Sequence, residues 1–184
     1  MARAFETTAH VSAPPEAVFA RLDDQARLAA HMERPSAMMG GGRMTYEFDA
    51  DRGQTVGSHI KMGGSAFGLS LYVDEVVTMR EPPRRKAWKT VGAPRLLVVG
   101  AYEMGFDITP TAAGADLRVW ITYDLAPGLL GRCLGPILAP LYAKWCVGRM
   151  ANDAATHFGQ LATTPSTAAV RPGHSQGVAG GRGI

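Results

Sequence analysis

One carboxylate, Glu75, falls on the apolar side of a segment in which apolar and polar residues alternate, with Val73 and Val77 at the same parity on either side of it. Burial in an apolar interior raises the pKa of a carboxyl group, which can then act as a general acid or base near neutral pH. Such a group suits an aldol-type cyclisation or a dehydration. A β-bulge at residues 74–75 would instead turn the side chain to water, so Glu75 is a catalytic candidate with this alternative beside it.

Further side chains share the inward parity of the predicted strands, or one face of a predicted C-terminal helix. Apolar pockets with a few polar groups are the usual sites for small molecules, and methionine adapts to irregular shapes. The residues expected to line a cavity are Tyr46, Ser58, Met62, Leu71, Tyr102, Met104, Tyr123, Val147, Ala151 and Asn152. The methionines could equally fill a core, and buried tyrosine hydroxyls need partners for structural reasons alone.

No other motif indicates a chemistry. The histidines lack the spacing of a metal site, no Gly-x-Ser-x-Gly nucleophile motif occurs, and Gly40, Gly41 and Gly42 lack the P-loop lysine and the dinucleotide fingerprint. We therefore expect no metal and no cofactor, and interpret the glycines as a loop. Cys133 and Cys146, without a secretory signal, indicate reduced thiols in a cytoplasmic protein.

The formal charge of +3 is no signal for nucleic acid. Two of the 19 basic residues lie in residues 163–184, which hold no acidic residue. The other basic residues nearly balance the 16 acidic ones, so the rest of the chain is nearly neutral. The one dense basic run, Arg84, Arg85 and Lys86, is interpreted as a solvated strand edge or turn, with an anionic-ligand or membrane-surface patch as the alternative. We expect no nucleic-acid partner.

Residues 125–147 are largely apolar and approach the length of a membrane span. They also contain Arg132, Lys144 and three prolines, which are costly in an isolated lipid-facing helix. A loop that leads into a buried helix is the better interpretation. We expect no integral membrane span, and peripheral membrane contact stays open.

Alternation and turn signals predict a strand at 3–11 and six strands over 43–125. Between them we expect one short helix that ends near residue 23 and a second over 25–32. Gly63 and Gly64 are expected to turn the chain, and Asp23 and Asp24 to cap the second helix. A long helix begins at Pro136 or Pro140 and ends near Ala162. Short turns favour an antiparallel sheet. One domain spans 1–162, and the Ser-, Thr-, Pro- and Gly-rich residues 163–184 are expected to be disordered.

Three segments carry a family resemblance: residues 11–20 (VSAPPEAVFA) with an Asp-bearing helix after them, the turn at 81–85 (EPPRR), and the hairpin at 106–119. They resemble the START-like (SRPBCC) superfamily, in its bacterial polyketide cyclase/dehydrase and lipid-transport branch. The resemblance implies an α+β helix-grip fold of the START/Bet v 1-like type. In that fold a curved antiparallel sheet of six to seven strands wraps around the long C-terminal helix and encloses a cavity.

This resemblance favours a non-catalytic protein that binds or carries a small hydrophobic ligand, such as a lipid, a polyketide or an aromatic molecule. The alternative is a polyketide cyclase or dehydratase that uses the same cavity, and a weaker one is a protein-interaction module like the co-chaperone relatives of the fold. The absence of a recognisable acid/base constellation favours binding. Ligand identity and oligomeric state are left open by the sequence.

Overall fold

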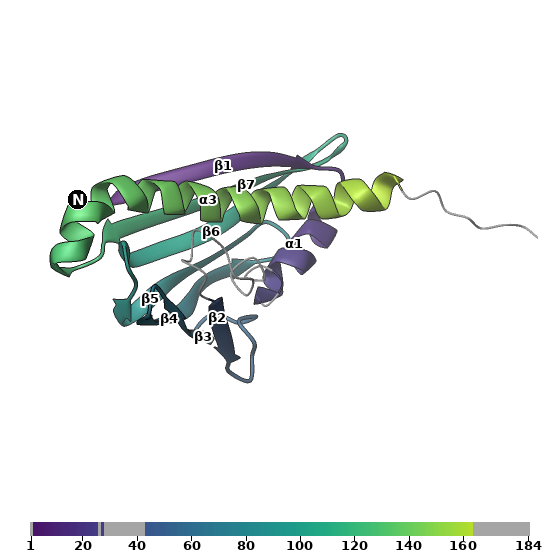
Figure 1. Ribbon diagram of the computed structural model, residues 1–184. Helices are drawn as coiled ribbons and strands as arrows, with labels where there is room; N and C mark the ends of the chain where they lie inside the picture. Colours follow the sequence, from purple (N-terminus) through teal and green to yellow (C-terminus); the bar gives the residue numbers. More distant parts are fainter. Residues whose placement is uncertain (1, 26, 28–42, 164–184) are drawn as a thin grey trace, which may run out of the picture.

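The computed structural model describes residues 2–25, 27 and 43–163. Seven strands form one antiparallel sheet in the order β1-β7-β6-β5-β4-β3-β2, and a long helix, α3, lies across one face of it (Figure 1). The elements are β1 (Arg3–Val11), α1 (Pro15–Asp23), β2 (Arg43–Phe48), β3 (His59–Ala66), β4 (Leu69–Glu81), β5 (Arg85–Arg95), β6 (Val99–Thr111), β7 (Gly114–Leu125) and α3 (Gly128–Thr163). The predicted antiparallel helix-grip architecture is confirmed.

In the N-terminal part, the described residues contain one short helix, α1, between β1 and β2. Of the second helix predicted over 25–32, residues 26 and 28–32 lie outside the described residues. The predicted cap is present at its start, because the Arg27 backbone N–H donates to Asp24 Oδ1 over 3.3 Å. Residues 164–184, predicted to be disordered, also lie outside the described residues.

The turn predicted at Gly63 and Gly64 is wrong, because both glycines lie inside β3 and pair with β2 and β4. The chain turns instead at Phe67 and Gly68, whose φ angles of 51° and 76° fall in the left-handed region. β3 itself begins at His59. Residues ahead of it form a loop that Asp49 holds, since it accepts hydrogen bonds from Ser58 Oγ (2.6 Å) and from the His59 backbone N–H (2.7 Å).

The long helix begins at Gly128, earlier than predicted, and contains Pro136 and Pro140. Proline has no N–H, so Pro140 leaves the carbonyl of Pro136 without its partner within the helix. Arg3 of β1 fills this gap, because its Nη1 donates to the Pro136 carbonyl over 3.1 Å. The loop expected ahead of Pro136 is wrong, because α3 already begins at Gly128. The helix continues through Pro140, since Arg3 of β1 binds the carbonyl that Pro140 leaves free. No helix in the described part of the chain is long and apolar enough to cross a membrane.

The main contacts of α3 are with β1 and β7, and the interior divides into two apolar clusters. The larger cluster joins α1 and α3 to β1, β6 and β7 and includes Val18, Phe106, Leu117 and Val147. The smaller cluster lies on β3 and β4 and includes Ile60, Met62, Leu71 and Val77. Tyr102 and Tyr142 are half-buried and pack against both clusters, so the two clusters meet at these rings.

One member of the predicted solvated basic run is buried, which corrects the prediction for that residue. Arg84 and Arg85 are exposed, but Lys86 is 1% exposed. Its Nζ donates to Asp23 Oδ1 over 2.9 Å and to the Asp23 carbonyl over 3.1 Å. Arg80 of β4 also binds the Asp23 carboxylate, through Nε and Nη2, with a shortest distance of 2.8 Å. Asp23 thus ties the end of α1 to β4 and β5 instead of capping the next helix.

Replacement of Asp23 should be strongly destabilising, because it leaves the ammonium group of Lys86 buried without its counter-ion. We expect Asp23→Ala to lower the free energy of unfolding by about 3 kcal/mol or more in urea denaturation. Asp24→Ala is the matched control, since its carboxylate is more exposed and pairs with exposed Arg27, and we expect a loss of about 1 kcal/mol or less. Equal losses for the two variants would contradict the assignment of Asp23 as the anchor.

Candidate functional site

Glu75 lies in the middle of β4, opposite Ile60 of β3 and Thr90 of β5, and is 3% exposed. Irregularities of the β4–β5 register fall on both sides of it, between Tyr72 and Asp74 and between Val77 and Met79. Neither turns the carboxylate to water, so the bulge considered in the sequence analysis does not expose the side chain. Glu75 is instead buried on the inner face of the sheet, between Val73 and Val77 of the same strand, which are also buried.

Two side chains from the neighbouring strands hydrogen-bond to this carboxylate. Tyr102 of β6 donates its hydroxyl to Glu75 Oε1, and Trp88 of β5 makes a second side-chain hydrogen bond to the group. Thr90 positions Tyr102, because its Oγ1 accepts from the Tyr102 backbone N–H over 3.1 Å. This bond lies just beyond the last paired residues of β5 and β6, Lys89 and Glu103, so a side chain continues the ladder where the backbone pairing ends.

Burial raises the pKa of Glu75 to about 7, although the hydrogen bonds from Tyr102 and Trp88 favour the charged form. Lys86 also lowers this pKa and Asp74 raises it, both by smaller amounts than burial does. The pKa of Tyr102 is raised well above its usual value, first by burial and then by the adjacent Glu75. At neutral pH the carboxyl group is therefore close to half-protonated, and the tyrosine keeps its proton as a hydrogen-bond donor.

The helix α3 adds Tyr142 and Cys146 to this site, one helical turn apart. Burial raises the pKa of Cys146 to about 12 and raises that of Tyr142, and the charge of Glu75 contributes to both shifts. The sequence analysis missed these two residues, since it judged the cysteines only for metal or disulfide spacing. The signal was available in their i, i+4 spacing, on the face that also carries buried Ala139 and Ala143.

The other predicted cavity residues fall into several groups. Met62 and Leu71 are buried in the smaller cluster, and half-buried Tyr46 packs against it. Met104, Tyr123, Val147 and Ala151 are buried in the larger cluster. Ser58 is buried but binds Asp49 and the Gly53 backbone N–H, which makes it part of the loop ahead of β3. Asn152 is exposed on α3, so its predicted place inside the molecule is wrong.

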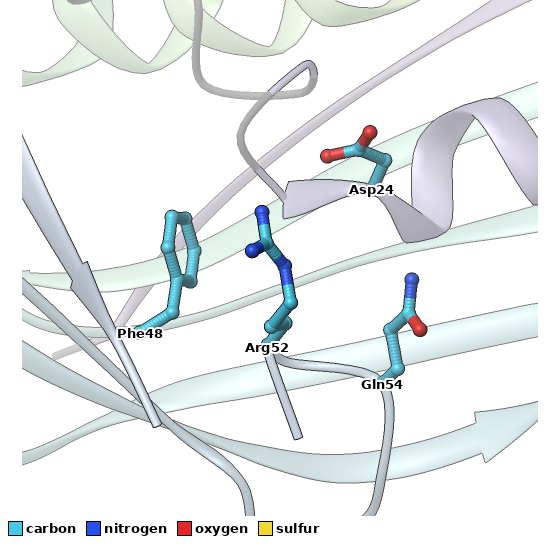
Figure 2. A pocket seen from close by; sticks show the side chains of 4 residues that line it. All are labelled: Asp24, Phe48, Arg52 and Gln54. Atoms are coloured by element: carbon cyan, nitrogen blue, oxygen red, sulfur yellow. The ribbon is translucent and has the colours of Figure 1, made fainter. Parts of the chain in front are cut away.

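A small polar pocket of about 60 Å³ lies elsewhere, between Asp24, Phe48, Arg52 and Gln54. Figure 2 shows the guanidinium of Arg52 between the ring of Phe48 and the carboxylate of Asp24, and its Cζ lies 5.9 Å from the ring centroid. Pockets for drug-sized ligands occupy roughly 300 to 1,000 Å³, so this one is too small for such a molecule. Within the described ranges, no group of three histidine, cysteine or acidic side chains is arranged to hold a metal ion.

The raised pKa of Glu75 predicts a specific pH dependence of stability. Because the pKa is about 7 in the folded protein and lower in the unfolded chain, the group's contribution is complete at acid pH and is lost as the pH rises through 7. We expect Glu75→Gln to match the wild type near pH 5 and to exceed its free energy of unfolding at pH 8, by as much as about 3 kcal/mol.

Urea denaturation at several pH values measures this difference. Glu47→Gln, at an exposed position of β2, should follow the wild type throughout. In Tyr102→Phe the loss of a donor to the carboxylate should move the transition to higher pH. A constant difference between Glu75→Gln and the wild type from pH 5 to pH 8 would contradict the buried, protonated state.

Comparison with solved structures relates this fold to proteins of low sequence identity. Norcoclaurine synthase from Thalictrum flavum aligns with a TM-score of 0.61 at 15% identity, over 87% of this chain and 88% of that one. The protein TTHA0849 from Thermus thermophilus gives 0.61 at 15% identity, over 88% and 100%. CV1439 from Chromobacterium violaceum gives 0.53 at 21% identity, over 83% and 96%. These similarities confirm the fold.

None of the curated proteins matches the sequence. The family described as polyketide cyclase / dehydrase and lipid transport does match, over residues 2–159, which include every described strand and nearly all of α3. The resemblance noted in the sequence is thereby confirmed, and the chain belongs to this polyketide cyclase / dehydrase and lipid transport family.

Proposed function

We propose that this protein binds a small hydrophobic molecule, such as a lipid, a polyketide or an aromatic compound, and that Glu75 and Tyr102 hold a polar group of that ligand. Membership of the family implies a cavity for a hydrophobic ligand. The observation that carries the assignment is the buried Glu75–Tyr102 hydrogen bond, which lies where the two apolar clusters meet. A few polar groups in apolar surroundings are what fixes the orientation of a ligand in such sites.

The chemistry of the carboxyl group fits a ligand with a hydroxyl or carbonyl function. A carboxylate has about four acceptor positions, and a protonated carboxyl group also has a donor. With a pKa of about 7, Glu75 can supply either form at neutral pH. Among proteins of this fold, norcoclaurine synthase has been solved in complex with dopamine and hydroxybenzaldehyde, which are aromatic molecules with such groups.

If Glu75 binds a polar group of the ligand, removal of its carboxyl group should abolish that hydrogen bond and keep the apolar contacts of the ligand. We expect native mass spectrometry of protein purified from the expressing cells to show an apolar adduct. With the adduct extracted, Glu75→Leu should weaken binding of 2-naphthol about fivefold to tenfold and leave naphthalene unaffected, as loss of one hydrogen bond requires. Isothermal titration measures both affinities.

Glu103→Leu, at an exposed position of β6, is the matched control and should bind both probes like the wild type. The proposal fails if no adduct is found and neither probe binds the wild-type protein. If both probes bind but Glu75→Leu affects them equally, the ligand site exists and Glu75 is not its polar contact.

A second candidate function is a cyclase or dehydratase of the same ligand class, favoured by the pKa of Glu75 near 7. Glu75 would take a proton from the carbon next to a carbonyl group, and its conjugate acid would return it to a departing hydroxyl, which leaves as water. Burial raises the pKa values of Tyr102, Tyr142 and Cys146, so these groups keep their protons at neutral pH and Glu75 would carry both proton transfers.

For this enzyme function we expect Glu75→Gln to keep ligand affinity and to lower kcat at least about a hundredfold, as loss of a general acid–base group does. The wild-type rate should change around pH 7, in line with the pKa of the carboxyl group. Turnover of the extracted ligand or of short poly-β-keto thioesters, followed by mass spectrometry, measures both. A variant that retains its rate would remove Glu75 from catalysis and leave the binding function.

A further inference from the structure

The amino-terminal part of α3 turns its large apolar side chains to solvent. The exposed fractions are 81% for Leu129, 67% for Ile137, 55% for Leu141, 43% for Leu134 and 40% for Leu138. Residues 134, 137, 138 and 141 have the i, i+3, i+4, i+7 spacing of a single helix face. These four residues form what we term the apolar helix face. Contiguous exposed apolar surface of this kind usually marks an interaction site.

The residues that face the sheet from the same turns are small. Gly131, Gly135, Ala139 and Ala143 are all buried. At Gly135 an added Cβ would lie 3.3 Å from Leu125 Cδ2 of β7. A helix placed by core packing alone buries its large apolar residues, and this part of α3 does the opposite. Packing against the sheet therefore does not explain the five apolar residues.

The charges around the apolar helix face are basic. Lys144 lies three residues after Leu141 and seven after Ile137, so it borders this face, and it is exposed. The sequence holds no Asp or Glu between Asp124 and Asp153. Apolar residues with lysine and arginine beside them are typical of helices that lie in the surface of a membrane with anionic lipids. Self-association through this face would bring basic residues of two copies together, which is unfavourable.

We propose that the apolar helix face docks on the surface of an anionic lipid bilayer, with its leucine and isoleucine side chains in the interface and Lys144 at the lipid phosphates. This docking is independent of the ligand proposed for Glu75. It adds a membrane partner to the molecule: α3 lies across the sheet (Figure 1), so one side of the helix covers the interior and the other side would contact the lipid surface.

Flotation with vesicles of phosphatidylcholine, with or without 30% phosphatidylglycerol, tests the proposal. We expect the full chain to float with the anionic vesicles, to float poorly with neutral ones, and to be released by high salt. Ile137→Glu/Leu141→Glu should weaken binding roughly tenfold or more, because it removes apolar contact and adds like charge to the lipid. Thr8→Glu/Ser70→Glu adds the same charge at exposed positions of β1 and β4, away from α3, and should bind nearly as well as the wild type.

The thermal unfolding midpoints of both double variants should stay close to that of the wild type, since all four side chains are exposed. Absence of flotation of the wild type with anionic vesicles overturns the proposal, as does equal loss in the two double variants. Light scattering distinguishes the other occupant: a dimer that Ile137→Glu/Leu141→Glu dissociates, without vesicle binding, would assign the face to a second copy of this chain. Loss of ligand binding at Glu75 with retained flotation would leave this inference unaffected.

Discussion

The buried pair of Lys86 and Asp23 fixes the geometry on which the interior depends. A buried ammonium group is tolerated only with a counter-ion and hydrogen bonds close by, and Asp23 supplies both its carboxylate and its carbonyl. This requirement holds the end of α1 against β4 and β5. Along the same two strands lie Trp88, two residues after Lys86, and Glu75, so the anchor and the candidate site share one rigid part of the sheet.

Two buried carboxyl groups in this small interior have opposite pKa shifts. Burial would raise the pKa of Asp23, but hydrogen bonds from Arg80 and Lys86 outweigh this effect and lower it. Glu75 has hydrogen bonds from a tyrosine and a tryptophan, no cation among the described residues binds it directly, and burial prevails. The pKa values differ because cations bind Asp23 and neutral side chains bind Glu75. Asp23 therefore stays charged and holds the structure, whereas Glu75 can exchange a proton.

Alternation in the sequence was enough to predict β1 and the strand faces, because a half-buried strand repeats every two residues. It gave Glu75 inward parity but left open a bulge that would turn the side chain to water. Positions that depend on contacts distant in sequence could not be predicted in this way. The partner of Lys86 is 63 residues away, and a run of three basic residues is a solvated turn in most proteins. Gly63 and Gly64 satisfy the local signal for a turn, yet they sit in the middle of a ladder. Pro136 and Pro140 satisfy the local signal for a helix boundary, yet the helix continues through them, and Arg3 of β1 binds the carbonyl that Pro140 leaves free.

That contact between Arg3 and Pro136 joins residues 133 positions apart, the first residue of β1 and the amino-terminal part of α3. β1 also pairs with β7, the last strand to be made, so the first strand synthesised has no partner until most of the chain has left the ribosome. Folding must therefore wait for a closure of high contact order, which is slow and leaves strand edges open in the meantime. Arg3, the first residue of β1, is thereby part of the support of the long helix α3.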